Sequence, residues 1–242
     1  MNENYFHLDE NRFHNHIDPH KKASSFSDII LGGQDGLVNV LGVVLGIAAA
    51  TSDPHIVMVA GLAATFAESV SMGAVAYTST LADIDYYEAE RAREYRHINQ
   101  APHIEKNEIR EIYSRKGFTG ELLDRIVDTI TANEDVWVAV MMSEEHQIVQ
   151  ADRSDAARSA LIVGVSAIVG SLIPLMPFIF LPVTTSMWVS VLITALVLYG
   201  VGAYKARMMV GRPFRSGVEM AVIGTVSALV GYAVGALLKV NP

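Results

Sequence analysis

The sequence contains no cysteine, and only 18% of its 242 residues are charged. The absence of cysteine excludes a disulfide scaffold, thiolate zinc sites, iron–sulfur clusters and a cysteine nucleophile. Runs of basic residues are also absent and the formal net charge is −8, which argues against nucleic acid as a partner. A soluble domain of this size carries about 25% charged residues, whereas this chain has a mean hydropathy of +0.30. Part of it is therefore expected to lie in a lipid bilayer.

Five segments are long and apolar enough to cross a bilayer as helices. About 20 apolar residues span the hydrocarbon core, and the segments that satisfy this length are 28–50, 55–82, 158–180, 185–205 and 217–238. The sequence therefore predicts an all-α, multi-pass membrane protein with five transmembrane helices. A polar tail, residues 1–27, precedes them and lacks the order of a signal peptide. Its four histidines suit either a metal-collecting segment or a plain polar tail: His7, His14, His16 and His20.

The positions of lysine and arginine predict which side of the membrane each loop occupies, because cytoplasmic loops retain basic residues. With five spans, 17 of the 18 Lys and Arg residues fall on the side of the N-terminus, and only Lys239 falls on the other. The tail and the segment between spans two and three, residues 83–157, are therefore predicted to be cytoplasmic. The membrane part then comprises residues 28–82 and 158–238.

Small residues predict where the membrane helices touch. Glycines four residues apart let two backbones approach closely in lipid. Three such pairs lie in spans one and five: Gly32/Gly36, Gly42/Gly46 and Gly231/Gly235. Because glycine is common in membrane helices in any case, a reading without close contacts stays equally open for each pair.

Two carboxylic acids lie at membrane depth, Asp35 in span one and Glu68 in span two. A carboxylate there is costly unless it faces a cavity or a partner, so the two mark a pathway. Met72 lies one helical turn beyond Glu68, with Ser71 beside it, and Asn39 follows Asp35 in span one. Together these side chains offer carboxylate, neutral oxygen and thioether donors. That mixture suits a divalent transition metal better than Ca²⁺ or Mg²⁺.

Each of these residues also has a structural alternative. Asp35 can cap a helix break beside its glycines, Glu68 can be a buried proton-sharing group, and Met72 can serve in packing. Acting together, carboxylates that bind a cation can release it in exchange for protons. The set therefore favours metal–proton antiport as a hypothesis.

The segment between spans two and three is strongly acidic. From Asp83 to Arg158 it holds 17 acidic and 10 basic residues. It predicts charged helices, the first of which continues span two because no Pro or Gly lies between Ala74 and Ala101. Two sets of ionisable residues each share one helix face: Glu90, Glu94 and His97, then Glu105, Glu108 and Glu111.

A further helix in this insert adds donors. Met141 and Glu145 lie four residues apart, so they share one side of the helix, with Met142 next to them. Three helices with aligned glutamates predict a multinuclear iron or manganese site. The alternative is a solvated face on which interleaved basic residues compensate the acids: Arg91, Arg93, Arg96, Lys106 and Arg110.

Glu94 and His97 also match the Glu-x-x-His element of carboxylate-bridged di-iron bundles. This match leaves open a membrane-tethered ferrous oxidase, or a metal-sensing or storage protein without transport. Such a bundle needs a second Glu-x-x-His element, and the sequence has none. A purely structural membrane scaffold is a third hypothesis, but it gives no reason for carboxylates in the bilayer.

The order of these motifs resembles the vacuolar iron transporter family. The resemblance rests on Asp35–Asn39 in span one, Glu68–Gly73 in span two, the acidic insert and Ser171–Phe178 in span three, and it covers Ser27 to about Leu238. It implies a homodimer of five-span subunits that exports Fe²⁺ or Mn²⁺ from the cytosol in exchange for protons, along a path at the dimer interface. The membrane would be vacuolar in a eukaryote and the cell membrane in a prokaryote.

The resemblance also implies roles for particular residues. Asp35 and Met72 match the metal pathway of the family. The insert matches its cytoplasmic metal-binding positions at Glu94, Glu105, Glu108, Met141, Met142 and Glu145. His97 departs from the family pattern, which has glutamate there, and this puts the metal preference in question. The resulting prediction is a proton-coupled Fe²⁺ or Mn²⁺ transporter, open also to Zn²⁺ or Co²⁺, with no enzymatic activity and no permanent cofactor.

Overall fold

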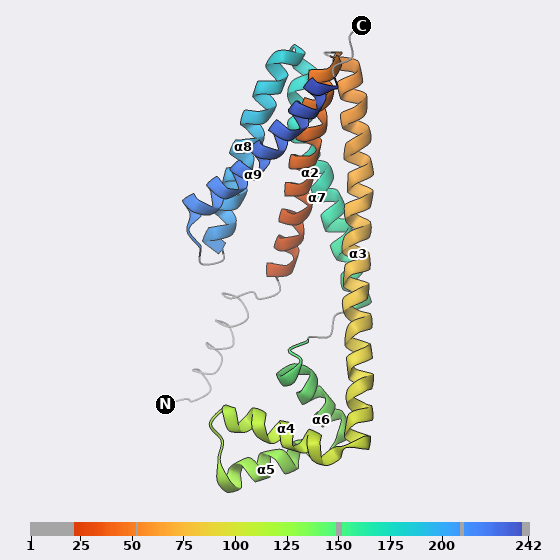
Figure 1. The fold of residues 1–242 in the computed structure, drawn as a ribbon, viewed down its shortest axis with the longest axis vertical. Coiled ribbons are helices and arrows are strands. Elements are labelled where there is room, and N and C mark those ends of the chain that lie inside the picture. Colours follow the sequence, from red (N-terminus) through yellow and green to blue (C-terminus); the bar gives the residue numbers. More distant parts are fainter. Residues whose placement is uncertain (1–21, 52, 149–151, 209–210, 239–242) are drawn as a thin grey trace, which may run out of the picture. The chain divides into compact units, whose positions relative to one another are not determined.

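The computed structural model describes residues 22–51, 53–148, 152–208 and 211–238, so the four predicted tail histidines lie outside the described residues. Within these ranges all regular secondary structure is helical (Figure 1), which confirms the predicted all-α class. The chain divides into two compact units. One comprises Met1–Ala76 with Ala157–Pro242, and the other is Tyr77–Ala156. Each is described by itself below.

Five helices are long and apolar enough to cross a membrane, as the sequence predicts. They are α2 (Lys22–Thr51), α3 (Pro54–Gln100), α7 (Arg153–Phe180), α8 (Val183–Met208) and α9 (Pro213–Leu237). The 47-residue α3 is a single helix that runs through span two into the insert, and this continuity confirms the prediction made from the absence of Pro and Gly between Ala74 and Ala101. Asp53 caps its start by accepting a hydrogen bond from the His55 N–H at 2.8 Å.

The first unit is packed in the manner of a membrane protein. Large apolar side chains point outward, and Trp188, Phe180 and Val70 are 79%, 77% and 74% exposed. Small and hydroxyl side chains lie inside, for example Ser190 and Thr194 on α8, which are fully buried. This distribution suits a bundle surrounded by lipid, where burial of apolar surface gains little and close packing holds the helices together.

The predicted glycine contacts are present. Gly42 and Gly46 of α2 pack against Gly231 and Gly235 of α9, and a Cβ added at Gly46 would lie 2.9 Å from the Gly231 carbonyl oxygen. The other pair, Gly32/Gly36, packs against the backbone of α7. Figure 1 shows α9 beside α8 and α2 in this unit. All three glycine pairs therefore hold helices of one chain together.

The second unit contains the C-terminal part of α3, with shorter helices beside its end (Figure 1). Its other elements are α4 (Pro102–Arg115), α5 (Gly120–Thr131), α6 (Glu134–Val140) and a π-helical turn, η1 (Met141–Glu145). The α4–α5 turn uses Gly117 and Gly120, whose φ angles of 96° and 60° favour glycine. At the next helix start, Asn133 caps α6 by accepting a hydrogen bond from the Val136 N–H.

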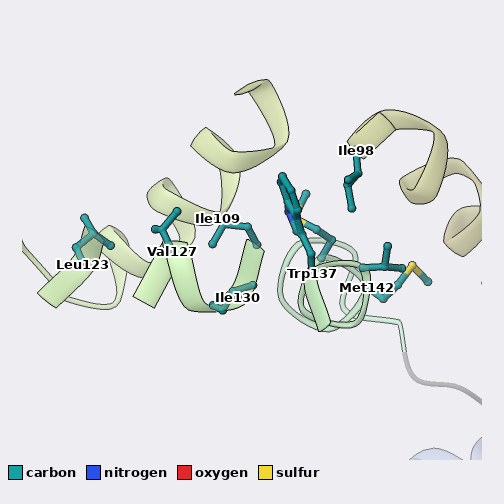
Figure 2. Close-up of a cluster of buried hydrophobic side chains, with 9 residues drawn as sticks. Ile98, Ile109, Leu123, Val127, Ile130, Trp137 and Met142 are labelled. Carbon is teal, nitrogen blue, oxygen red and sulfur yellow. The ribbon is translucent and has the colours of Figure 1, made fainter. Parts of the chain in front are cut away.

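An apolar core holds these short helices together. Figure 2 shows Ile98 of α3, Ile109 of α4, Val127 of α5 and Trp137 of α6 converging within it. Met142 belongs to the same core, so η1 is anchored from the inside. This core fixes the helix faces that carry the ionisable residues.

Candidate metal centre

A polar contact joins α2 and α3 in the membrane unit. The Asn39 side-chain amide donates a hydrogen bond to Glu68 Oε1 at 2.5 Å. Asp35 lies one helical turn before Asn39, close enough to Glu68 for the two carboxyl groups to interact. Because α2 continues without a break through Asp35, the structure gives no support to the helix-break cap. Three of the predicted pathway residues are thus brought together.

The other two predicted pathway residues lie on α3 near Glu68. Met72 is half-buried and Ser71 is exposed, and among the described residues neither side chain hydrogen-bonds to Glu68. Asp35 also lines a cavity of about 220 Å³ with Val38 and with Ile223 of α9. The polar group therefore has open space next to it.

In the second unit, three predicted ligands from two helices form a first group. Glu94 and His97 project from α3 and Glu105 from α4. His97 Nδ1 lies 3.6 Å from Glu94 Oε1 and 3.6 Å from Glu105 Oε1. Three potential ligand atoms, one per residue, lie within 4.8 Å of one another. Two ligands of one ion are at most about 4.4 Å apart, so small side-chain movements would let these atoms share a cation.

A second group uses the same Glu94 together with Glu145 and His146. His146 Nε2 lies 3.1 Å from Glu94 Oε1. Sequence reasoning missed His146, because it assumed α-helical spacing from Met141 to Glu145. The chain instead forms a π-helical turn there, and the His146 N–H donates to the Met141 carbonyl five residues earlier. No periodicity in the sequence predicts such a turn. The position of a histidine directly after the predicted ligand Glu145 could still have marked it as a candidate ligand.

Burial makes two of these carboxylates unusual. Glu94 and Glu105 are only 2% and 5% exposed, and Oε2 of each is buried without a hydrogen-bond partner among the residues that the structure describes. A buried oxygen left unpaired costs free energy that a bound proton or cation recovers. These unpaired oxygens fit ligands of a positively charged ion.

Several basic residues of the unit form ion pairs with acids outside these two groups. Lys106 pairs with Asp128 at 2.7 Å and Arg110 with Asp124 at 2.6 Å. Among the described residues, no Lys or Arg forms a salt bridge with Glu94, Glu105 or Glu145. The alternative of a solvated helix face required Lys or Arg to compensate these glutamates. The observed ion pairs, which leave the three glutamates without such a base, weigh against it.

Glu90 differs from the other predicted ligands. It is buried, but Arg93 lies 3.0 Å from its Oε1, and Glu90 belongs to neither group. Its charge is therefore already matched by a base on the same helix.

Carboxylate crowding changes the protonation of the cluster. Burial, followed by the nearby charges of Glu108 and Glu94, raises the pKa of Glu105 to about 7. Burial and the charge of Glu108 also raise the pKa of Glu145, against the lowering effect of His146. Glu108 is thus brought to the cluster as predicted, although its burial is only partial. With a pKa of about 7, Glu105 is partly protonated at neutral pH, and a divalent cation can displace its proton.

The two predicted thioether ligands lie in the apolar core. Met141 and Met142 are 0% and 1% exposed and pack with Trp137 and Ile109. Their sulfurs therefore contribute to packing in this conformation, as is common for methionine.

Comparison with known proteins finds one family and several relatives that match nearly the whole chain. Residues 26–236 match the model of the VIT family. Vacuolar iron transporter 1 of Oryza sativa subsp. japonica is 32% identical over 221 residues, which cover 90% of this chain and 88% of the relative. The vacuolar iron transporter of Plasmodium berghei (strain Anka) is 29% identical over 251 residues, covering 100% of this chain and 90% of the relative.

Proposed function

Because this chain belongs to the VIT family, we propose that it is a transporter, and not an enzyme, that carries Fe²⁺ across a membrane. Its relatives in rice and Plasmodium are named vacuolar iron transporters. We extend the proposal to Mn²⁺ as a second cargo and to protons as the exchanged ion. Imidazole donors suit iron, and carboxylate and amide oxygens suit manganese.

The observation that carries this proposal is the polar group inside the membrane unit. Asn39 hydrogen-bonds to Glu68, and Asp35 lies within interaction range. Ionisable residues in a bilayer are costly and mark ion pathways by default. A cation that passes Asp35 and Glu68 competes with protons for the same carboxyl oxygens, so metal movement out of the cytosol and proton movement into it are coupled.

The helical insert serves as the capture site. Its cluster combines Glu94, Glu105, Glu108 and Glu145 with two histidines, and its carboxylates lack Lys or Arg partners among the described residues. Because α3 is one helix, it carries residues of both the capture cluster and the membrane pathway. The insert would face the cytosol, in line with the strong bias of basic residues to that side.

The active form would be a homodimer. Asn39 and Ser71 are exposed on helices that cross the membrane, although polar side chains avoid contact with lipid. A second copy that covers this face would remove the exposure and place the pathway at the interface. In a eukaryotic cell we expect this dimer in the vacuolar membrane, as the names of the relatives suggest.

Reconstitution tests the proposal. Liposomes containing the protein, with a metal-quenched dye and a pH dye in the lumen, should show Fe²⁺ entry together with proton exit. Asp35→Asn should lower both fluxes by about tenfold or more, equivalent to about 1.4 kcal/mol of lost stabilisation. Glu219→Gln, which changes an exposed carboxylate near the start of α9, is the matched control and should transport normally.

Two results would contradict the proposal. Fe²⁺ entry that is unchanged in Asp35→Asn would remove that residue from the pathway. Oxygen consumption with Fe²⁺, in the absence of metal entry, would favour the membrane-tethered oxidase instead.

A further inference from the structure

We propose that His97 and His146 are metal ligands, one in each ligand group of the cluster, and that they shift its preference towards Co²⁺ and Zn²⁺ and away from Mn²⁺. The inference rests on the proposed function, because the same cluster captures the transported ion. It concerns which ions the cluster selects, and it assigns a role to His146.

The two groups have the same composition. Each combines two carboxylates with one imidazole, and Glu94 is common to both. His97 presents Nδ1 to Glu94 and Glu105, whereas His146 presents Nε2 to Glu94. Each histidine therefore turns a different ring nitrogen towards a shared carboxylate.

Ion pairing between histidine and glutamate does not account for this arrangement. The carboxylates of Glu94, Glu105 and Glu145 outnumber the two imidazoles. Even with the histidines in place, Oε2 of Glu94 and Oε2 of Glu105 are buried and have no hydrogen-bond partner in the described part of the chain. These atoms sit on side chains more than nine-tenths buried, within groups whose donor atoms are close enough to share an ion.

Imidazole changes which ions such a group prefers. Mn²⁺ is suited by carboxylate, carbonyl and water oxygens, whereas imidazole suits Zn²⁺ and the later first-row ions. Affinity at a mixed nitrogen and oxygen site rises from Mn²⁺ through Fe²⁺ to Co²⁺. A neutral imidazole in place of a carboxylate also removes one negative charge, which weakens the binding of an ion held mainly by electrostatic attraction. Both effects disfavour Mn²⁺.

The test is a competition between Co²⁺ and Mn²⁺ for the purified full-length protein at one fixed pH. The histidines of residues 1–20 are replaced by asparagine in every form, so that the tail contributes no imidazole. Replacing either imidazole, by His97→Glu or by His146→Gln, is expected to lower the Co²⁺/Mn²⁺ affinity ratio by about tenfold. His103→Gln, an exposed histidine of α4 outside both groups, is the control and should leave the ratio unchanged.

Proton NMR of the Co²⁺-loaded protein gives a second readout, and its main signals are measured on the unsubstituted cluster. Direct ligation predicts paramagnetically shifted imidazole N–H signals from two histidines, one of which disappears in His146→Gln. The absence of such signals in the unsubstituted cluster would overturn the inference, and so would a ratio that changes by less than about twofold in both ligand variants. If Fe²⁺ transport still required Asp35 in that case, the proposed function would stand while the inference failed.

Discussion

Replacing Glu105 by glutamine should stabilise the metal-free helical unit at neutral and higher pH. In the folded chain the pKa of Glu105 is raised to about 7, first by burial and then by the charges of Glu108 and Glu94. Glutamine has nearly the same shape but carries no charge at any pH. The variant therefore avoids the cost of holding a carboxylate in this crowded site.

The magnitude follows from the pKa change. A carboxyl group whose pKa is higher in the folded state binds its proton more tightly there. The stability that this binding contributes is fully present below the pKa of the unfolded chain, and it is lost as the pH rises through the pKa of the folded chain. A rise from 4.5 to about 7 corresponds to about 3 kcal/mol at about 1.4 kcal/mol for each pKa unit. We therefore expect Glu105→Gln to match the unchanged protein near pH 4.5 and to be about 3 kcal/mol more stable at pH 8.

Urea unfolding of the full chain in detergent, with a chelator present, measures this difference. Trp137 is 6% exposed in the core of the helical unit, so its fluorescence reports on that unit. Trp188→Phe removes the second tryptophan, which is an outward-facing residue of α8. Glu111→Gln changes an exposed carboxylate on the same helix as Glu105 and serves as the control.

The reasoning is refuted if Glu105→Gln is no more stable than the unchanged protein at pH 8. It is equally refuted if both proteins lose stability in parallel between pH 5 and pH 8, because the pH dependence would then arise from other groups.

Two further predictions concern packing. Gly235→Ala should destabilise the membrane unit by about 1–3 kcal/mol, because the added Cβ would overlap the backbone of Gly46. Gly200→Ala, where the added Cβ meets open space, is the control and should be neutral. Thermal unfolding in detergent measures both variants, and equal melting temperatures would contradict the prediction. Met142→Leu should preserve both stability and Co²⁺ affinity, since the side chain fills the core and the volume is conserved. Isothermal calorimetry would instead show weakened binding if the sulfur were a ligand.

The membrane topology could be predicted from sequence because it depends on one-dimensional properties. Span length and hydropathy identified all five membrane helices, with helix bounds within about six residues of the structure except at the end of α3, which continues to Gln100. The continuation of α3 from span two into the insert was predictable because no Pro or Gly lies between Ala74 and Ala101. The glycine pairs indicated close contacts, but they did not reveal that Gly42 and Gly46 meet the pair on α9.

The sequence by itself determined the five spans, the acidic insert and the kinds of donor that it carries. Only the tertiary structure decided which carboxylates keep a free oxygen, because Arg93 reaches Glu90 whereas Glu94 and Glu105 are buried beyond the reach of any described lysine or arginine. Helical periodicity shows which residues share a face, and the face's partner is set by packing between helices distant in sequence. For the same reason the π-helical turn that brings His146 to Glu94 became visible only in the folded chain.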